Sequence, residues 1–234
     1  MGQAYFVSGI DTGIGKTIVT GLMARDLLSN GADVITVKLV QTGNEGYSED
    51  IDLHRKICGI GHLQEDREGL TMPQIFKFPS SPLLAASLEG RTVDVDRISS
   101  SVRACCVRHD IVLVESAGGL CVPLTEDCLS VDLAAAEDWP LILVTCGRLG
   151  SINHALLSLE AAKARGMKVA GVVHNWHPDA DPTIDSDAIV TVRRALVRMG
   201  YPPVVVSVGR FNQGENPPQT DFLTLFKTVE DDLI

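Results

Sequence analysis

The chain has little basic charge and no long hydrophobic segment. Its 20 Lys and Arg residues stand against 30 Asp and Glu residues, which gives a formal net charge of −10. An acidic surface excludes a broad nucleic-acid footprint, so any nucleotide must be met by a local cationic pocket. The first five residues begin no basic, signal-like segment, and no apolar run reaches the length of about eighteen residues that a membrane span requires. We therefore expect a soluble, cytoplasmic protein that binds neither membranes nor nucleic acids.

Disulfide and metal frameworks are also missing from the pattern. The six cysteines include no C-x-x-C pair and are too few for a disulfide scaffold, which indicates reduced thiols. Linker-like and low-complexity stretches are absent from the sequence as well. Because 234 residues suffice for a full hydrophobic core, we expect residues 1–234 to form a single domain.

What the chain does contain is an alternation of apolar, strand-like runs with helix-like segments. Strand-like runs occupy residues 4–8, 32–40, 110–114, 141–145, 169–173 and 204–206. Helix-like segments occupy residues 18–24, 49–58, 94–107, 151–165 and 186–199. This alternation predicts an α/β fold with a parallel β-sheet and helices on both faces. Ligands in that architecture bind beyond the carboxyl ends of the strands, so the residues that end each run are the functional candidates.

The most specific motif is G-I-D-T-G-I-G-K-T at residues 9–17, between the first strand-like run and the first helix-like segment. Its glycines let consecutive backbone N–H groups point at phosphate oxygens, and the helix adds the positive end of its dipole. The motif predicts a phosphate-binding loop of the P-loop NTPase type. Lys16 would reach the β- and γ-phosphates, and Thr17 would bind Mg²⁺. The G-K-T ending disfavours the alternative, an ordinary glycine-rich turn.

Two further strand ends carry charge. Lys38 interrupts the apolar sequence V-I-T-V-K-L-V, and burying it is costly unless an anion meets it; the alternative is a lysine that extends to solvent. Four hydrophobic residues lead into Glu115, the pattern of a Walker-B strand whose carboxylate supports Mg²⁺ beside phosphates. Thr42 follows the first of these strands, in a loop that can hold polar substrate groups. The segment S-A-G-G at 116–119 follows the second and permits a close approach of backbone to ligand.

Three other features are open to two interpretations from the residues alone. Asp50 fits either a second metal carboxylate or a helix N-cap. Ser151, at the start of a helix-like segment, fits either a structural cap or, with the free N–H groups of that helix, an anion site. His174 and His177 flank Asn175, but two histidines without further ligands do not make a metal site, so we assign none.

Taken together, these segments resemble the dethiobiotin synthetases, the ATP-dependent enzymes of biotin biosynthesis. The resemblance covers nearly the whole chain in order. Besides residues 9–17, it is carried by V-K-L-V-Q-T-G at the second strand end, F-P-S-S-P-L-L-A-A at 78–86, V-E-S-A-G-G at 114–119 and R-L-G-S-I-N-H-A at 148–155. It implies an ATP- and Mg²⁺-dependent ring closure on 7,8-diaminononanoate with CO₂ (or bicarbonate as its source), which gives dethiobiotin, ADP and phosphate.

The resemblance also implies roles for single residues, with Lys38 and Lys16 as the catalytic lysines. The magnesium ligands are Thr17, Asp50 and Glu115. Asp52 competes with Asp50 for the position of the family's metal-binding aspartate. The ATP site comprises Gly13, Ile14, Gly15, Lys16, Thr17, Ile18, Asp50, Glu115, Ser116, Ala117, Gly118, Asn175, Trp176, Gly209, Arg210 and Phe211. The diamine site comprises Thr12, Thr42, Gly150, Ser151, Ile152 and Asn153, the last four from the partner subunit of a homodimer.

The chain departs from the family pattern at a few positions, among them Leu39, where proline is usual, and Leu83, where histidine is usual. Neither departure removes a charge that the chemistry requires, so they bear on affinity and base selectivity rather than on the reaction. Two rivals share the fold. A partitioning-type ATPase switch carries a second lysine where this chain has Asp11. A cobyrinic-acid-type amidoligase adds a glutaminase domain, for which 234 residues leave no room.

Overall fold

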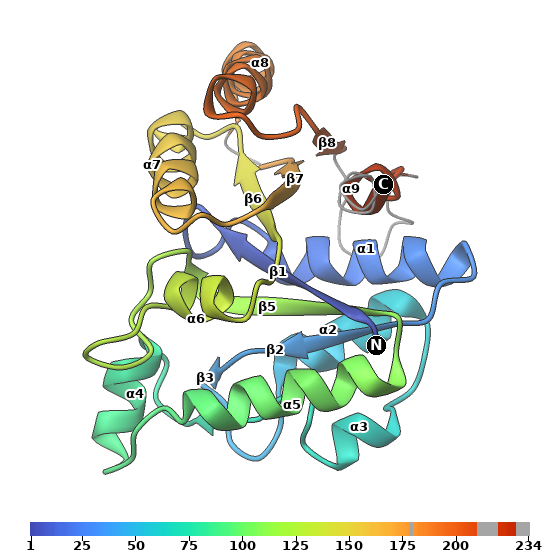
Figure 1. The fold of residues 1–234 in the computed structure, drawn as a ribbon, viewed down its shortest axis with the longest axis vertical. Coiled ribbons are helices and arrows are strands. Elements are labelled where there is room, and N and C mark those ends of the chain that lie inside the picture. Colours follow the sequence, from blue (N-terminus) through green and yellow to red (C-terminus); the bar gives the residue numbers. More distant parts are fainter. Residues whose placement is uncertain (178–179, 210–219, 228–234) are drawn as a thin grey trace.

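The computed structural model describes residues 1–177, 180–209 and 220–227, and its framework is a six-stranded parallel sheet (Figure 1). The strands are β1 (Gln3–Gly9), β2 (Val34–Lys38), β5 (Ile111–Gly119), β6 (Leu141–Cys146), β7 (Val169–Asn175) and β8 (Val205–Val208). Their spatial order is β2-β5-β1-β6-β7-β8, and each pairing is parallel. A second, two-stranded sheet pairs β3 (Gln41–Thr42) with β4 (Ile75–Phe76). The predicted α/β fold with a parallel sheet is confirmed.

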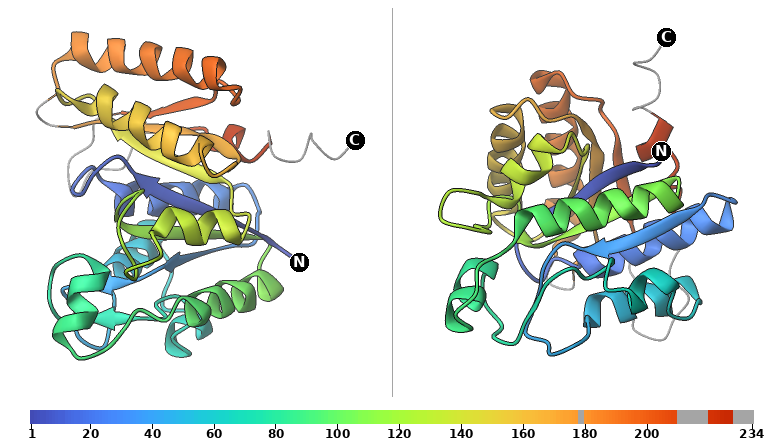
Figure 2. Two further views of the ribbon diagram at one scale, coloured as in Figure 1. Left: turned by 60° about the vertical axis from the view of Figure 1, so that its left-hand side comes forward. Right: turned by 60° about the horizontal axis from the view of Figure 1, so that its bottom comes forward.

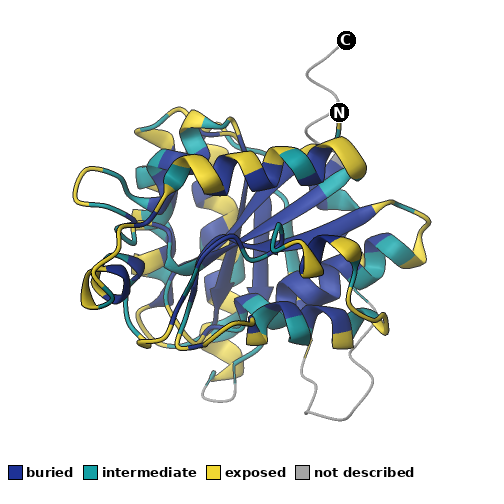
Figure 3. Ribbon diagram, turned by 90° about the horizontal axis from the view of Figure 1, so that it is seen from below, coloured by how far each residue is buried: buried dark blue, intermediate teal, exposed yellow. Residues whose placement is uncertain are grey.

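Helices cover both faces of the six-stranded sheet (Figures 2 and 3). On one face, α1 (Lys16–Ser29) packs against α2 (Glu49–Cys58). The other face carries α5 (Val95–Arg108), α6 (Ser130–Ala136), α7 (Ser151–Lys163) and α8 (Pro182–Met199). The remaining described helices are short: α3 (Gln64–Arg67), α4 (Pro82–Leu88) and α9 (Thr224–Lys227).

The strands form the centre of the hydrophobic core. Every residue of β6 and of β7 is buried, which is the burial pattern of a parallel sheet covered on both faces. The six cysteines are free, as their spacing predicted, and burial raises the pKa of Cys105 to about 12. Within the described ranges, no helix combines the length and hydropathy needed to cross a membrane.

Several element boundaries differ from the prediction. The strand expected over residues 32–40 ends at Lys38, and the chain turns into the short β3. The last long helix begins at Pro182 rather than at residue 186, because Asp181 caps it by accepting from the backbone N–H groups of Thr183 and Ile184. Proline at the first helical position suits this start, since its φ is already helical and no N–H is lost from the ladder.

The register of the sheet brings distant residues together at the carboxyl ends of β1, β2 and β5. Lys38 pairs with Glu115 across β2 and β5, and Glu115 pairs with Val7 across β5 and β1. The loop that follows β1 therefore begins beside both charged residues, although more than a hundred residues separate the two ends of this arrangement in sequence.

Candidate active site

The loop between β1 and α1 has the geometry of a phosphate cradle. Gly13 and Gly15 have φ values of +73° and +86°, and a Cβ on Gly15 would lie 2.3 Å from Asn175 Nδ2. Gly15 is the N-cap of α1 and has no side chain to accept from the first N–H groups of the helix. Asn175 Nδ2 donates to the Ile14 carbonyl at 2.9 Å and ties the loop to β7. The start of α1 is thereby shaped to receive an anion.

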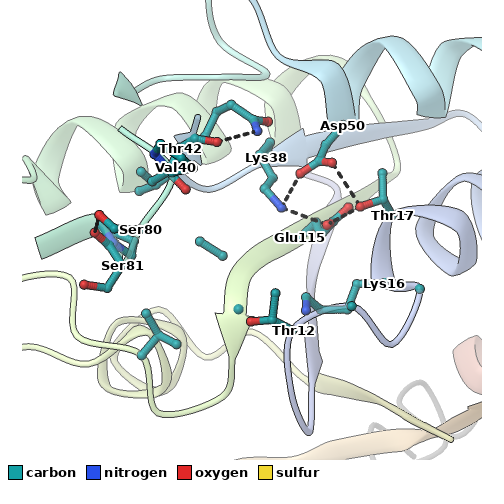
Figure 4. Close-up of a pocket in the computed structure, with 18 of the residues that line it drawn as sticks. Thr12, Lys16, Thr17, Lys38, Val40, Thr42, Asp50, Ser80, Ser81 and Glu115 are labelled. Atoms are coloured by element: carbon teal, nitrogen blue, oxygen red, sulfur yellow. Dashed lines mark hydrogen bonds and ion pairs between the residues drawn. The ribbon is translucent and has the colours of Figure 1, made fainter. Parts of the chain in front are cut away.

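A cavity of about 760 Å³ opens beside this loop, within the range of roughly 300–1,000 Å³ that is usual for small-molecule sites (Figure 4). The predicted site residues that line it are Thr12, Gly13, Gly15, Lys16, Thr17, Ile18, Lys38, Thr42, Asp50, Glu115, Ala117 and Gly118. The lining residues that the sequence analysis did not assign are Val40, Gln41, Pro79, Ser80, Ser81, Pro82 and Val122. The Ser81-Pro82 pair was the available signal for part of this second set, because serine followed by proline is typical of a helix start, here that of α4.

Lys38, Asp50, Glu115 and Thr17 meet at one side of the cavity (Figure 4). Lys38 Nζ lies 2.5 Å from Asp50 Oδ2 and 2.8 Å from Glu115 Oε1. Thr17 Oγ1 lies 3.1 Å from Asp50 Oδ1 and 2.9 Å from Glu115 Oε1. Lys38 is thus buried between two carboxylates, and the alternative of a lysine that extends to solvent is wrong.

Pairing overcomes burial for both charges of the central ion pair. Burial by itself would lower the pKa of Lys38, but the carboxylates of Glu115 and Asp50 outweigh it and hold that pKa above its usual value. Burial would likewise raise the pKa of Glu115, but Lys38 and His54 hold it well below its usual range. Both groups are therefore charged throughout the neutral pH range.

Lys16 is less fully neutralised than Lys38. Its Nζ donates to the backbone carbonyl of Asp11 at 2.9 Å. Burial lowers its pKa to about 8, and the attraction of Glu115 offsets this only in part. A phosphate that enters the loop would add the counter-charge and favour the protonated lysine, so binding of the anion and protonation of Lys16 support each other.

The donor set at this side of the cavity fits a hard divalent cation. The Thr17 hydroxyl and the carboxylates of Asp50 and Glu115 are oxygen ligands, which Mg²⁺ uses together with phosphate oxygens and water. No three His, Cys, Asp or Glu side chains in the described ranges form a metal-holding group by themselves. Asp52 lies elsewhere, with its Oδ1 3.4 Å from His62 Nε2 at the surface. The geometry therefore favours Asp50 over Asp52 as the acid of this site.

Other residues assigned to the ATP site lie outside the cavity lining. Ser116 is buried, and its carbonyl accepts from Lys38 Nζ at 3.1 Å. Trp176 and Gly209 directly follow β7 and β8, which are neighbours in the sheet. Two assigned residues fall outside the described part of the chain: Arg210 and Phe211.

The residues expected to hold the carboxylate of the diamine lie at the start of α7. Gly150 caps the helix with a φ of +93°, and Ser151 is buried with its Oγ 3.4 Å from Cys146 Sγ. Ile152 is partly exposed and Asn153 is exposed. None of residues 150–153 lines the main cavity of the same chain, so their role in the diamine site remains a prediction that requires a second subunit.

His54 is not among the predicted site residues, yet it is buried beside the site with its Nε2 2.8 Å from Glu115 Oε2. A signal for it was present, because His54 follows Asp50 by four residues and therefore lies on the same face of α2. A helix that presents one carboxylate to the site presents this imidazole as well.

The glycine-rich cradle at the start of α1, the carboxylate that ends β5 and the order of the sheet define a P-loop NTPase. The chain matches the family model described as an AAA domain over residues 3–217. It is 45% identical to ATP-dependent dethiobiotin synthetase BioD 2 of Pasteurella multocida, over 84% of this chain and 92% of that protein. It is 48% identical to ATP-dependent dethiobiotin synthetase BioD of Chlorobaculum tepidum, over 86% and 84%. The chain belongs to the ATP-dependent dethiobiotin synthetase family.

Solved structures with the same fold are more distant. A ParA family ATPase from Chlorobium tepidum matches with a TM-score of 0.53 and 15% identity, over 91% of this chain and 87% of that one. The pNOB8 ParA structure bound to nonspecific DNA matches with a TM-score of 0.60 and 12% identity, over 99% and 100%. Identities this low show the P-loop fold alone, and the DNA of the second structure carries no argument for this chain.

Proposed function

We propose that the protein forms dethiobiotin from 7,8-diaminononanoate, CO₂ and ATP, with release of ADP and phosphate. Membership of the family supports this reaction. The single observation that carries it is the convergence of two lysines and two carboxylates on one cavity beside a phosphate cradle. Phosphoryl transfer depends largely on positioning and electrostatics, so this set of charges is what the reaction requires.

In the proposed order of reaction steps, one amine of the substrate is held as the carbamate formed with CO₂. A carbamate oxygen attacks the γ-phosphorus of ATP, and ADP leaves. The second amine then attacks the carbonyl carbon of the mixed anhydride, phosphate leaves with the bonding electrons, and the ureido ring closes. Lys38 is assigned to the carbamate and the transferring phosphoryl group, and Lys16 with the amides of the loop to the β- and γ-phosphates.

We assign the metal site to Thr17, Asp50 and Glu115. A bound Mg²⁺ would neutralise charge on the phosphate oxygens. Thr17 Oγ1 already lies within 3.1 Å of both carboxylates, which supports this assignment. Lys38 Nζ also contacts the same two carboxylates, so its positive charge offsets part of their negative charge.

The diamine is assigned to the space between Thr12 and Thr42, which both line the cavity. Its carboxylate is assigned to residues 150–153 at the start of α7 in the partner subunit of a homodimer, where the positive end of the helix dipole favours an anion. The adenine is assigned to the ends of β7 and β8, where Asn175, Trp176 and Gly209 lie.

Phosphate release from ATP, measured with and without the diamine and bicarbonate, tests the proposal. We expect phosphate to appear together with dethiobiotin, and only when both additions are present. Lys16→Ala should abolish this release by loss of phosphate alignment, while the melting temperature stays close to that of the parent. Phosphate release that ignores the diamine would contradict the proposal, and normal ring closure in Lys16→Ala would contradict the assignment of the loop.

A partitioning-type ATPase switch is the alternative function, and the contacts of Asp11 disfavour it. Asp11 stands where such switches carry a second lysine, and its carboxylate pairs with Arg148 of the same chain. Asp11 is an acid, so it cannot act as the lysine that a switch supplies to a neighbouring active site.

We also propose that the protein, with its net charge of −10, does not bind nucleic acid. Retention of a nonspecific DNA duplex in a gel-shift assay at low salt would contradict this.

A further inference from the structure

We propose that His54 is a positioning residue that acts through Glu115 on Lys38 and Thr17. The inference rests on the proposed function, because it concerns the same site. His54 is fully buried and lies outside the cavity lining, so it does not touch a ligand there. Its ring bridges two partners: Nε2 lies 2.8 Å from Glu115 Oε2, and Nδ1 lies 3.0 Å from Thr36 Oγ1.

Glu115 divides its two carboxylate oxygens between the cavity and His54. Oε1 accepts from Lys38 Nζ at 2.8 Å and from Thr17 Oγ1 at 2.9 Å, whereas Oε2 contacts His54. Terminal torsions of glutamate are soft, so an unsupported carboxylate could rotate about its last bond. The contact at Oε2 opposes this rotation, and Oε1 stays directed at Lys38 and Thr17.

The chemistry of the neighbours indicates which nitrogen of His54 donates to Glu115. An ionised carboxylate only accepts hydrogen bonds, so Nε2 must carry the proton. Arg55 Nη1 donates to Thr36 Oγ1 at 2.8 Å, which leaves the hydroxyl proton of Thr36 free to point at His54 Nδ1. The donors then run in one direction, from Arg55 through Thr36 and His54 to Glu115.

The same network returns to Lys38 through the backbone. Arg55 forms a bidentate salt bridge with Asp66, with Nε 2.9 Å from Oδ2 and Nη2 2.8 Å from Oδ1. Asp66 Oδ1 also accepts from Thr71 Oγ1 at 2.7 Å. The carbonyl of Thr71 accepts from the backbone N–H of Lys38 at 2.7 Å. One buried network therefore holds both the backbone and, through His54 and Glu115, the side chain of Lys38.

The periodicity of two elements explains how the chain builds this network. Asp50 and His54 are four residues apart and share one face of α2, so the helix delivers a carboxylate to Lys38 and an imidazole to Glu115. Thr36 and Lys38 are two residues apart and share one face of β2, so the strand supports the imidazole and supplies the lysine. Partners that orient a metal ligand typically change metal affinity or activity by about 10- to 100-fold when they are lost.

Two substitutions of similar polarity separate the contact with Glu115 from the contact with Thr36. The side-chain amide of Gln reaches the position of imidazole Nε2, whereas the shorter Asn reaches only that of Nδ1. We expect His54→Asn to weaken Mg²⁺ binding by about 10- to 100-fold and His54→Gln to keep most of the parental Mg²⁺ affinity. Calorimetric titration of Mg²⁺ in the presence of a non-hydrolysable ATP analogue measures both affinities. Binding of the analogue in excess chelator should be the same in both variants.

His62→Gln is the matched control, because the side chain of His62 is exposed. It lies 3.4 Å from the exposed carboxylate of Asp52 and 3.7 Å from Asp66 Oδ2, which is beyond hydrogen-bond distance and leaves the contacts of Asp66 with Arg55 in place, so the Mg²⁺ titration of this variant should match the parent. Parental Mg²⁺ affinity in both His54→Asn and His54→Gln would overturn the proposal. Equal weakening in both variants would also overturn it, since a purely structural defect does not distinguish the two nitrogens.

A spectroscopic measurement on the unsubstituted protein covers the case in which His54→Asn does not fold. With ¹⁵N-labelled histidine, we expect the Nε2 of His54 to carry a slowly exchanging proton, with its signals assigned by their loss in His54→Gln. A bare Nε2 would overturn the proposal. Neither measurement uses dethiobiotin formation, so an inactive parent would refute the proposed function and leave the test of His54 intact.

Discussion

At the scale of single residues, the two lysines of the site differ in how their charge is held. Lys38 is fixed between Asp50 and Glu115, whereas Lys16 is desolvated and relies on an incoming anion. Lys38 therefore provides a permanent, preorganised cation. We expect Lys38→Gln to lower the turnover number for ring closure by about 100-fold or more, the usual cost of removing one such group.

Steady-state assays of Lys38→Gln at saturating ATP and diamine measure this effect, with the melting temperature as a control because Asp50 and Glu115 lose their common partner. A turnover number within a few-fold of the parent would show that Lys38 serves only to neutralise the carboxylates of Glu115 and Asp50.

Lys16 predicts a pH dependence of nucleotide binding. Its pKa of about 8 in the free protein should rise when phosphates add counter-charge, so binding takes up protons where the free lysine is deprotonated and the bound one is not. ATP affinity should therefore be constant well below pH 8 and fall as the pH rises through about 8. Calorimetry in two buffers of different ionisation enthalpy measures the uptake at pH 9, and Lys16→Ala should abolish it. Proton release on binding would contradict the predicted sign.

The two acids near the start of α2 give a third prediction. Asp50 contacts Thr17 and Lys38, whereas Asp52 contacts His62 at the surface. Asp50→Asn should raise the Mg²⁺ concentration needed for half-maximal activity, because it removes negative charge from the proposed metal site, and Asp52→Asn should leave it unchanged. A sensitive Asp52 beside a silent Asp50 would mean that the aspartates have been assigned in the wrong order.

At the scale of elements, the start of α7 is where a structural cap and an anion site would look alike. We expect a diamine whose carboxylate is replaced by an amide to bind more weakly by up to ~2 kcal/mol, since a helix start favours a full negative charge when it is partly buried. Asn153→Ala should remove much of this difference and leave ATP affinity unchanged. Equal binding of both diamines to the parent would return the helix start to a purely structural role.

The elements that can be predicted from the sequence are those whose burial produces a long apolar run or a regular spacing of apolar residues. The central strands are buried on both faces and read as continuous apolar runs, which is why β6 and β7 are found from sequence. The two-residue strands β3 and β4 and the four-residue α3 are too short to show a period. The chemistry-bearing residues at strand ends follow from the topology, so Lys38 and Glu115 are predictable.

The spacing from Asp50 indicates which face of α2 carries His54, but the sequence does not reveal that His54 and Asp66 are buried. Each is a polar residue on a helix, and nothing local distinguishes a buried one from an exposed one. Their burial arises because Arg55 and Thr36 satisfy their hydrogen bonds across elements, which only the assembled structure shows.

At the scale of the whole molecule, the proposed diamine site requires two subunits. Mixing Lys38→Gln with Asn153→Ala chains tests this, because a mixed dimer then has one site in which Lys38 and Asn153 are both intact. With random exchange, half of the dimers are mixed and each has one working site of two. At a diamine concentration far below saturation, where Asn153→Ala dimers bind little diamine, we therefore expect about a quarter of the parental activity. Activity no higher than that of the separate variants, with dimers confirmed by sedimentation, would place both residues in the same chain's site.

The pairing of Lys38 with Glu115 makes the register of one strand pair a condition for the proposed catalysis. Side chains of a strand alternate between its two faces, so a slip of one residue between β2 and β5 would turn Lys38 to the opposite face of the sheet. The backbone hydrogen bonds between β2 and β5 therefore set the position of the Lys38 charge before any ligand binds. A single-residue insertion within β2 ahead of Lys38 would separate folding from function, leaving a sheet that still forms beside a cavity that has lost its cation.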